Sequence, residues 1–187
     1  MRNFHQIAGK VDVVPLLHAV QRHPELWNAN KFRTTFPNTP HSQVDDILIR
    51  FSDTEKCVTT THVMGDDSNI WYPAAGILYA AKPIILDLMR RVEAYELGRV
   101  LITRLRPGGR ILRHADRDGS YVQTSDRARY HVVLQGLPGS LYVTGDETVC
   151  MQTGDVWWFN AHEEHEVVNN SADDRIHMLV DVRTWTF

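Results

Sequence analysis

The pattern of apolar and polar positions changes character near residue 98. From Arg99 onward, short runs rich in β-branched and aromatic residues alternate with glycine or polar turns, which is typical of all-β barrels and sandwiches. The predicted strands are Val100–Arg106, Arg110–His114, Arg129–Gln135, Ser140–Thr144, Thr148–Met151, Val156–Asn160, His165–Asn169 and Ile176–Val182. These short strands predict a mainly β fold, a double-stranded β-helix (jelly roll) of cupin-like architecture.

The residues before this point form a helical and loop lead-in. Apolar residues at helical spacing predict one helix from Val14 to Arg22, and a second that has Pro83 in its first turn, runs through Glu96 and is ended by Gly98. A strand-like run covers Ile47 to Phe51. The remaining stretches, Lys31 to Gln43 and Asp53 to Pro73, have no sustained period. We expect these two loops to cover the mouth of the barrel and to carry substrate specificity.

Length and composition limit the possible classes of protein. A chain of 187 residues fits a single domain over 1–187, in which the lead-in 1–98 packs on a β-helix core of 99–187. A net charge of −3 argues against a nucleic-acid partner. The sequence has no apolar run of about 20 residues and no signal peptide at its start, so we expect a cytoplasmic protein without a membrane partner. Cys57 and Cys150 are then expected to stay free thiols.

Candidate metal ligands lie at His114 and Asp116, two positions apart. In an extended segment both side chains leave the same face and converge on one ion, and His165 supplies a third ligand from a late strand. Two histidines and one carboxylate with open remaining positions are typical of non-haem iron(II) oxygenases. A His-x-Asp pair alone is a weak motif, so further residues must support the interpretation.

Arg175 provides that support, because it stands ten positions after His165 at the start of the last apolar strand. A buried arginine needs an anion, and its planar fork suits a carboxylate. The alternative is a salt bridge to Asp173, Asp174 or another local carboxylate. Arg129 and His131, also two positions apart, are expected to add positive potential to the same interior. Such an interior is matched to a dianionic diacid.

Four segments together resemble the aspartyl/asparaginyl β-hydroxylase family. They read LITRLRPGGRILRHAD, RARYH, HEEHEVV and DDRIHMLVDV, within the region Val100 to Val182. The resemblance implies an Fe(II)- and 2-oxoglutarate-dependent oxygenase that uses O2 to hydroxylate a C–H position of an amino acid or peptide side chain. It also implies cosubstrate roles: Arg175 and Thr103 at the 5-carboxylate of 2-oxoglutarate, and Arg129 and His131 at its other carboxylate. One animal family member lacks the carboxylate ligand, whereas this chain has Asp116.

Arg127 and His177 each have two interpretations. Arg127 shares the parity of Arg129 and is a candidate for gripping a substrate carboxylate, or else a solvated loop residue. His177 shares the face of Arg175 and is a second candidate for substrate contact, or else a hydrogen-bonded interior histidine. His162 is expected at the rim rather than on the metal. The remaining histidines, which we interpret as surface or structural, are His5, His18, His23, His41 and His62.

Two other functions share this fold. The stretch GDVWWFNAHEEHEVVN resembles the second cupin motif, so a cupin-type dioxygenase or isomerase that does not use 2-oxoglutarate is one alternative. A non-catalytic ligand-binding barrel is the other. The cationic cradle of Arg175, Arg129 and His131 favours the 2-oxoglutarate enzyme, because a cupin has no need of a diacid site.

Overall fold

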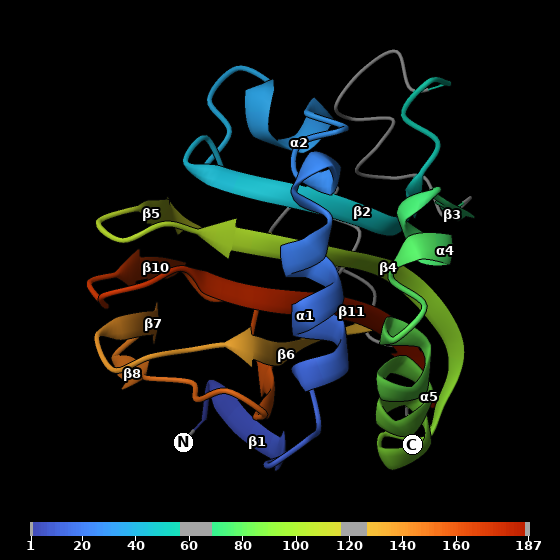
Figure 1. Cartoon of the computed structure of the whole chain (residues 1–187). Coiled ribbons are helices and arrows are strands. Elements are labelled where there is room, and N and C mark those ends of the chain that lie inside the picture. Colours follow the sequence, from blue (N-terminus) through green and yellow to red (C-terminus); the bar gives the residue numbers. More distant parts are fainter. Residues whose placement is uncertain (1, 57–68, 117–126, 186–187) are drawn as a thin grey trace.

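A computed structural model of the chain describes residues 2–56, 69–116 and 127–185, and in this part the strands form two antiparallel sheets. The large sheet has the order β1-β9-β6-β11-β4-β2-β3 and the small sheet the order β5-β10-β7-β8 (Figure 1). The large sheet consists of β1 (Phe4–Ala8), β2 (Val44–Ser52), β3 (Asn69–Trp71), β4 (Ala94–Leu105), β6 (Arg127–Gln135), β9 (Val156–Phe159) and β11 (Arg175–Thr184). The small sheet consists of β5 (Arg110–His114), β7 (Ser140–Thr144), β8 (Glu147–Val149) and β10 (His165–Asn169).

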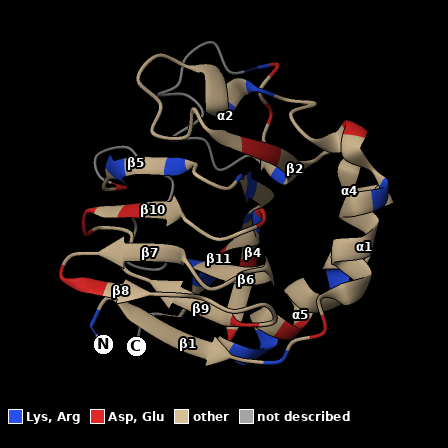
Figure 2. Cartoon of the chain, turned by 60° about the vertical axis from the view of Figure 1, so that its left-hand side comes forward, with Lys and Arg blue, Asp and Glu red and all other residues tan. Residues whose placement is uncertain are grey.

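Helices cover the outer face of the large sheet. The main ones are α1 (Val14–Arg22) and α5 (Ala81–Arg91), with the shorter turns η1 (Pro24–Leu26) and α4 (Ala74–Ile77). The short helix α2 (Phe32–Thr35) lies on the opposite face, where Phe32 packs against the cluster that contains Leu179. Leu16 of α1 and Leu88 of α5 pack with Ile102 and Met178 of the sheet in one hydrophobic core. Figure 2 shows the resulting layers, with α1, α4 and α5 on one side and the small sheet on the other.

A second core lies between the two sheets and determines where polar side chains can meet. It contains Leu105, Val133 and Phe159 from the large sheet and Tyr142 and Val167 from the small one. Because side chains alternate along a strand, the even-numbered residues of β11 face the helices and its odd-numbered residues face the small sheet. The central strand thus directs Arg175, His177 and Asp181 into the space between the sheets.

The fold class predicted from the sequence is confirmed: the chain is a mainly β double-stranded β-helix with helices before it. The helix predicted through Glu96 was wrong at its end. Glu93 takes a positive φ of 53°, and β4 begins at Ala94 and continues through Gly98. Pairing with β11, in which Glu96 lies opposite Arg183, outweighs the local helical preference.

The lead-in contributes more to the barrel than its pattern indicated. In addition to the predicted run at Ile47, it supplies β1 to one edge of the large sheet and β3 to the other. The loop expected over Lys31 to Gln43 contains the short helix α2. No helix in the described ranges is both long and apolar enough to span a bilayer.

Candidate metal centre and cosubstrate pocket

The three candidate ligands come together at one end of the small sheet. His114 and His165 are direct partners across β5 and β10, and their ring centroids are 4.3 Å apart. Asp116 follows β5, and its backbone N–H donates to Ala161 O. Oδ1 of Asp116 lies 3.7 Å from Nε2 of His114, and the ligand atoms of all three residues lie within 4.8 Å of one another. They are close enough to bind a single ion together.

Both candidate histidines present Nε2 to this position. Nδ1 of His114 is 2.7 Å from Leu112 O, and Nδ1 of His165 is 2.9 Å from Glu163 O. A carbonyl oxygen only accepts, so each Nδ1 carries the hydrogen and each Nε2 keeps its lone pair for a metal. Burial lowers the pKa of His165 to about 4, so its ring is neutral at physiological pH. This donor set fits a divalent metal such as Fe(II).

Asp116 is oriented by a buried ion-pair chain. Nη1 of Arg129 donates to Oδ2 of Asp116 at 2.9 Å, which leaves Oδ1 to face the histidines. The same guanidinium binds Asp181 through Nε–Oδ1 and Nη2–Oδ2 contacts of 2.7 and 3.0 Å. Burial opposes the charge of Arg129, but Asp181 and Asp116 outweigh burial and raise its pKa.

The ion-pair chain differs from the role that the sequence predicted for Arg129. We expected its charge to be available to a diacid, but two carboxylates already neutralise it. The reason lies on β11, where Asp181 is the strand partner of Arg129 and is almost fully buried. Arg129 does line the cavity, yet its hydrogen bonds connect it to Asp181 and to the candidate ligand Asp116.

Arg175 is a buried cation that has no carboxylate partner among the residues that the structure describes. Its side chain is 3% exposed, and its contacts within the described ranges are a hydrogen bond to Nδ1 of His177 at 3.0 Å and the ring of Tyr142 at 5.7 Å. The suggested salt bridge is not formed there, because Asp174 faces Arg104 instead. Burial lowers the pKa of Arg175 to about 10, a sign of an uncompensated charge. Such a guanidinium is ready to bind an anion.

A histidine pair connects Arg175 to the centre of the cavity. Since Arg175 donates to Nδ1 of His177, that atom is an acceptor, and Nδ1 of His131 at 3.2 Å must be the donor. Nε2 of His131 therefore holds a lone pair, and it is buried without a partner in the described part of the chain. Burial lowers the pKa of both rings well below the ordinary value. A carboxylate oxygen would thus form a hydrogen bond with Nε2 of His131 only if that nitrogen carried a proton.

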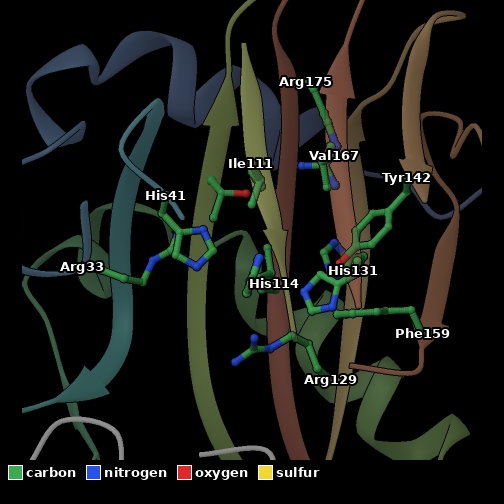
Figure 3. Close-up of a pocket in the computed structure, with 13 residues that line it drawn as sticks. Arg33, His41, Ile111, His114, Arg129, His131, Tyr142, Phe159, Val167 and Arg175 are labelled. Atoms are coloured by element: carbon green, nitrogen blue, oxygen red, sulfur yellow. The ribbon is translucent and has the colours of Figure 1, made fainter. Parts of the chain in front are cut away.

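A cavity of about 410 Å³, partly open to solvent, joins these groups (Figure 3). Its lining comprises Arg33, His41, Thr103, Ile111, His114, Arg129, His131, Tyr142, Phe159, His165, Val167, Arg175 and Leu179. Thr103 is 3% exposed and is the strand partner of His177. Arg175 pairs with Leu105, two positions along β4, so Thr103 and Arg175 line one cavity from neighbouring strands.

The two candidates for substrate contact do not border this cavity. His177 is buried beneath it and bonds Arg175, which matches the alternative reading of an interior histidine. Arg127 is half-buried at the start of β6, opposite Arg183 on β11. His162 is exposed, as expected for a rim residue.

Sequence reasoning missed several residues at the cavity. His41 was interpreted as surface or structural, but its ring packs edge-to-face on that of His114, with centroids 5.2 Å apart. Arg33 from α2 lines the same side. Both belong to the loop predicted to cover the barrel mouth, whereas Cys57, His62 and most of the second predicted loop lie outside the described residues. Asp181 could have been recognised from the sequence, because it is a carboxylate inside an apolar strand.

A double-stranded β-helix with a His-x-Asp and distal histidine triad defines the class of Fe(II)- and 2-oxoglutarate-dependent oxygenases. The family model for aspartyl/asparaginyl β-hydroxylase matches residues 79–184, more than half of the chain. The chain belongs to this family and is a hydroxylase of the Fe(II)/2-oxoglutarate-dependent class. A search among curated proteins found no similar sequence.

Solved structures with the same fold have little sequence in common with this chain. An oxidoreductase of the 2OG-Fe(II) oxygenase family from Burkholderia pseudomallei aligns with a TM-score of 0.54 at 16% identity, covering 89% of this chain and 78% of its own. The collagen prolyl hydroxylase of Paramecium bursaria Chlorella virus-1, solved with 2OG, gives 0.54 at 11% identity, covering 98% and 97%. A prolyl-4-hydroxylase from Pseudomonas putida gives 0.53 at 15%, covering 98% and 94%. These likenesses support the fold.

Proposed function

We propose that this hydroxylase holds Fe(II) through His114, Asp116 and His165 and anchors the 5-carboxylate of 2-oxoglutarate on Arg175 and Thr103. Its substrate is a C–H position of an amino acid or peptide side chain. The observation that carries the proposal is the buried guanidinium of Arg175, which has no carboxylate partner within the described ranges and shares a cavity with His114 and His165 of the triad.

The residues of the triad have distinct tasks. His114 and His165 offer Nε2 because backbone carbonyls hold their Nδ1–H groups. Asp116 offers Oδ1 because Arg129 holds Oδ2. These three residues would hold the metal and leave positions on it open for cosubstrate and oxygen. Bound iron and 2-oxoglutarate supply the oxidising chemistry: 2-oxoglutarate and O2 become succinate and CO2, with one oxygen atom inserted into the substrate C–H bond.

The cavity wall explains how a diacid is kept in one orientation. Arg175 and Thr103 form its distal end, with two guanidinium donors and a hydroxyl for one carboxylate. Tyr142, Phe159 and Val167 also line the cavity and would keep water from the three carbons between the two carboxylates. His177 holds Arg175 in place from below through its Nδ1 acceptor. The keto-acid end of the diacid then points toward the metal ligands.

Succinate formation tests the proposal directly. The purified protein is given Fe(II), 2-oxoglutarate and O2, first alone and then with free amino acids and short peptides. We expect slow iron-dependent succinate formation that one substrate class accelerates, with product heavier by one oxygen atom in mass spectrometry. The absence of succinate in every mixture, from protein shown to bind Fe(II), would contradict the proposal.

A further inference from the structure

His41 lies beside the metal ligands although it comes from the lead-in, outside the family-matched residues 79–184. Backbone hydrogen bonds fix its loop to both neighbouring strands: Leu112 N donates to Pro40 O, and Val44 N donates to His41 O, at 3.1 and 3.0 Å. Its ring stands at 87° to that of His114. The position of His41 is therefore set by the barrel rather than by a free loop.

The imidazole of His41 has an unused hydrogen-bonding atom. Nδ1 is buried and has no partner in the described part of the chain. A buried polar atom without a partner is unfavourable unless a ligand or a water supplies the missing bond. Because His41 lines the cavity, a molecule held in that cavity can supply it.

Arg33 adds donors on the same side of the cavity. Its Nε and Nη2 bind the buried carboxylate of Asp46 at 2.7 and 2.8 Å, which fixes the plane of the guanidinium. Its Nη1 makes no hydrogen bond within the described ranges. Figure 3 shows Arg33 and His41 on the side of the cavity away from Arg175, with His114 between them and His131. The two residues thus face the metal position from the side that the 2-oxoglutarate tail does not use.

We propose that His41 and Arg33 form the substrate subsite and bind an oxygen atom of the amino acid or peptide, a carboxylate or a carbonyl oxygen. This inference rests on the proposed function. With its hydrogen on Nδ1, the imidazole donates as the guanidinium does, so one oxygen acceptor satisfies both groups. Because Asp46 neutralises Arg33, recognition depends on directed hydrogen bonds more than on net charge.

Binding measurements on two matched probe series separate the two sources of such an oxygen. One series is free L-proline, L-aspartate and L-asparagine, and the other is the N-acetyl methylamides of the same residues. Each is titrated calorimetrically into oxygen-free protein loaded with Fe(II) and 2-oxoglutarate. Preference for the free series assigns the subsite to a carboxylate, and preference for the capped series assigns it to a carbonyl.

The variant His41→Phe keeps the aromatic packing on His114 and removes the nitrogen atoms. We expect it to weaken binding of the preferred probe by about ten- to a hundred-fold, as for loss of a hydrogen bond with a charged or polar partner. His41→Asn, whose amide lies near the former Nδ1, should recover part of the affinity and serves as the second variant if phenylalanine impairs folding. His18→Phe, at an exposed position of α1, is the matched control.

Three results would overturn the inference. One is equal affinity of wild type and His41→Phe for the preferred probe. Another is binding of neither series to a wild type that does form succinate. The third is loss of Fe(II) from the His41 variants, which would make His41 part of the metal site. A wild type that binds Fe(II) but forms no succinate with any probe would instead contradict the proposed function itself.

Discussion

Arg129 donates from Nη1 to Oδ2 of Asp116 at 2.9 Å and is itself held by two contacts to Asp181. An ion-pair chain of this kind decides which oxygen of Asp116 faces the metal position. It also ties a ligand that follows β5 to the central strand β11, so the metal site is braced against the large sheet.

Asp181→Asn should therefore weaken Fe(II) binding by about ten- to a hundred-fold, the usual effect of removing a group that orients a metal ligand. The substitution keeps the shape of the side chain and removes the charge that holds Arg129. Fe(II) affinity is measured by calorimetry without oxygen, alongside thermal unfolding of the metal-free protein. Asp87→Asn, which removes a surface carboxylate bonded to Arg90 and Arg91, is the matched control. Wild-type affinity in Asp181→Asn would show that the chain does not orient Asp116.

Asp116→Ala should abolish stoichiometric Fe(II) binding, because two imidazoles remain and the third ligand is lost. Metal content after equilibration with Fe(II) and dialysis measures the effect. Asp146→Ala, in the exposed turn between β7 and β8, should bind iron as wild type does. If Asp116→Ala bound iron and turned over normally, a two-histidine site would have to replace the triad.

Acid should destabilise the metal-free protein below about pH 6.5. Burial holds the pKa of His131 and His177 well below the ordinary value, so below 6.5 the unfolded chain binds more protons than the folded one. The stability that these groups contribute is thus complete above pH 6.5 and is lost as the pH falls. Each contributes a loss of about 1.4 kcal/mol per pH unit.

Urea unfolding at pH 7.5 and 5.5 checks this dependence. His131→Gln should reduce the fall in the free energy of unfolding by about 1 kcal/mol. His18→Gln, at an exposed position, should leave the fall unchanged. An equal fall in His131→Gln and wild type would mean that His131 takes up its proton as readily in the folded protein as in the unfolded chain.

The strands of the barrel were predictable because alternation of side chains leaves a direct trace in the sequence. The predicted run Arg110–His114 coincides with β5, and His165–Asn169 coincides with β10. The N-terminal strands were harder to predict, since β1 and β3 are short edge strands whose pairing partners are distant in sequence. Helix α5 was placed too long because its apolar stripe continues past the residue at which the backbone leaves the helix.

The site was predictable where residue spacing alone carries the information. His114, Asp116 and His165 do meet, and Arg175 lines the same cavity as the two histidines. The partner of a charge was not predictable in this way. Arg129 and Asp181 are 52 positions apart, and only the register of β6 on β11 brings them together. His41 was missed for the same reason, because its contact with His114 depends on how a loop packs against β5.

The central claim is that Arg175 binds 2-oxoglutarate. Substitution of Arg175 tests this claim without changing the metal ligands. Arg175→Lys should bind 2-oxoglutarate with intermediate affinity, because a single ammonium cannot reproduce the two-pronged contact of a guanidinium. Arg110→Ala, at an exposed position of β5, should bind it as wild type does. Fe(II) binding should survive in both proteins, since neither residue belongs to the triad.

Calorimetric titration of 2-oxoglutarate into the oxygen-free, Fe(II)-loaded Arg175→Ala protein is the most direct measurement. Removing one partner of a buried ion pair costs roughly 3–5 kcal/mol, and about 1.4 kcal/mol corresponds to a tenfold change in affinity. We predict 2-oxoglutarate binding weakened by about two to four orders of magnitude with Fe(II) retained. Affinity within about a factor of three of wild type, well under 1.4 kcal/mol, would contradict the account.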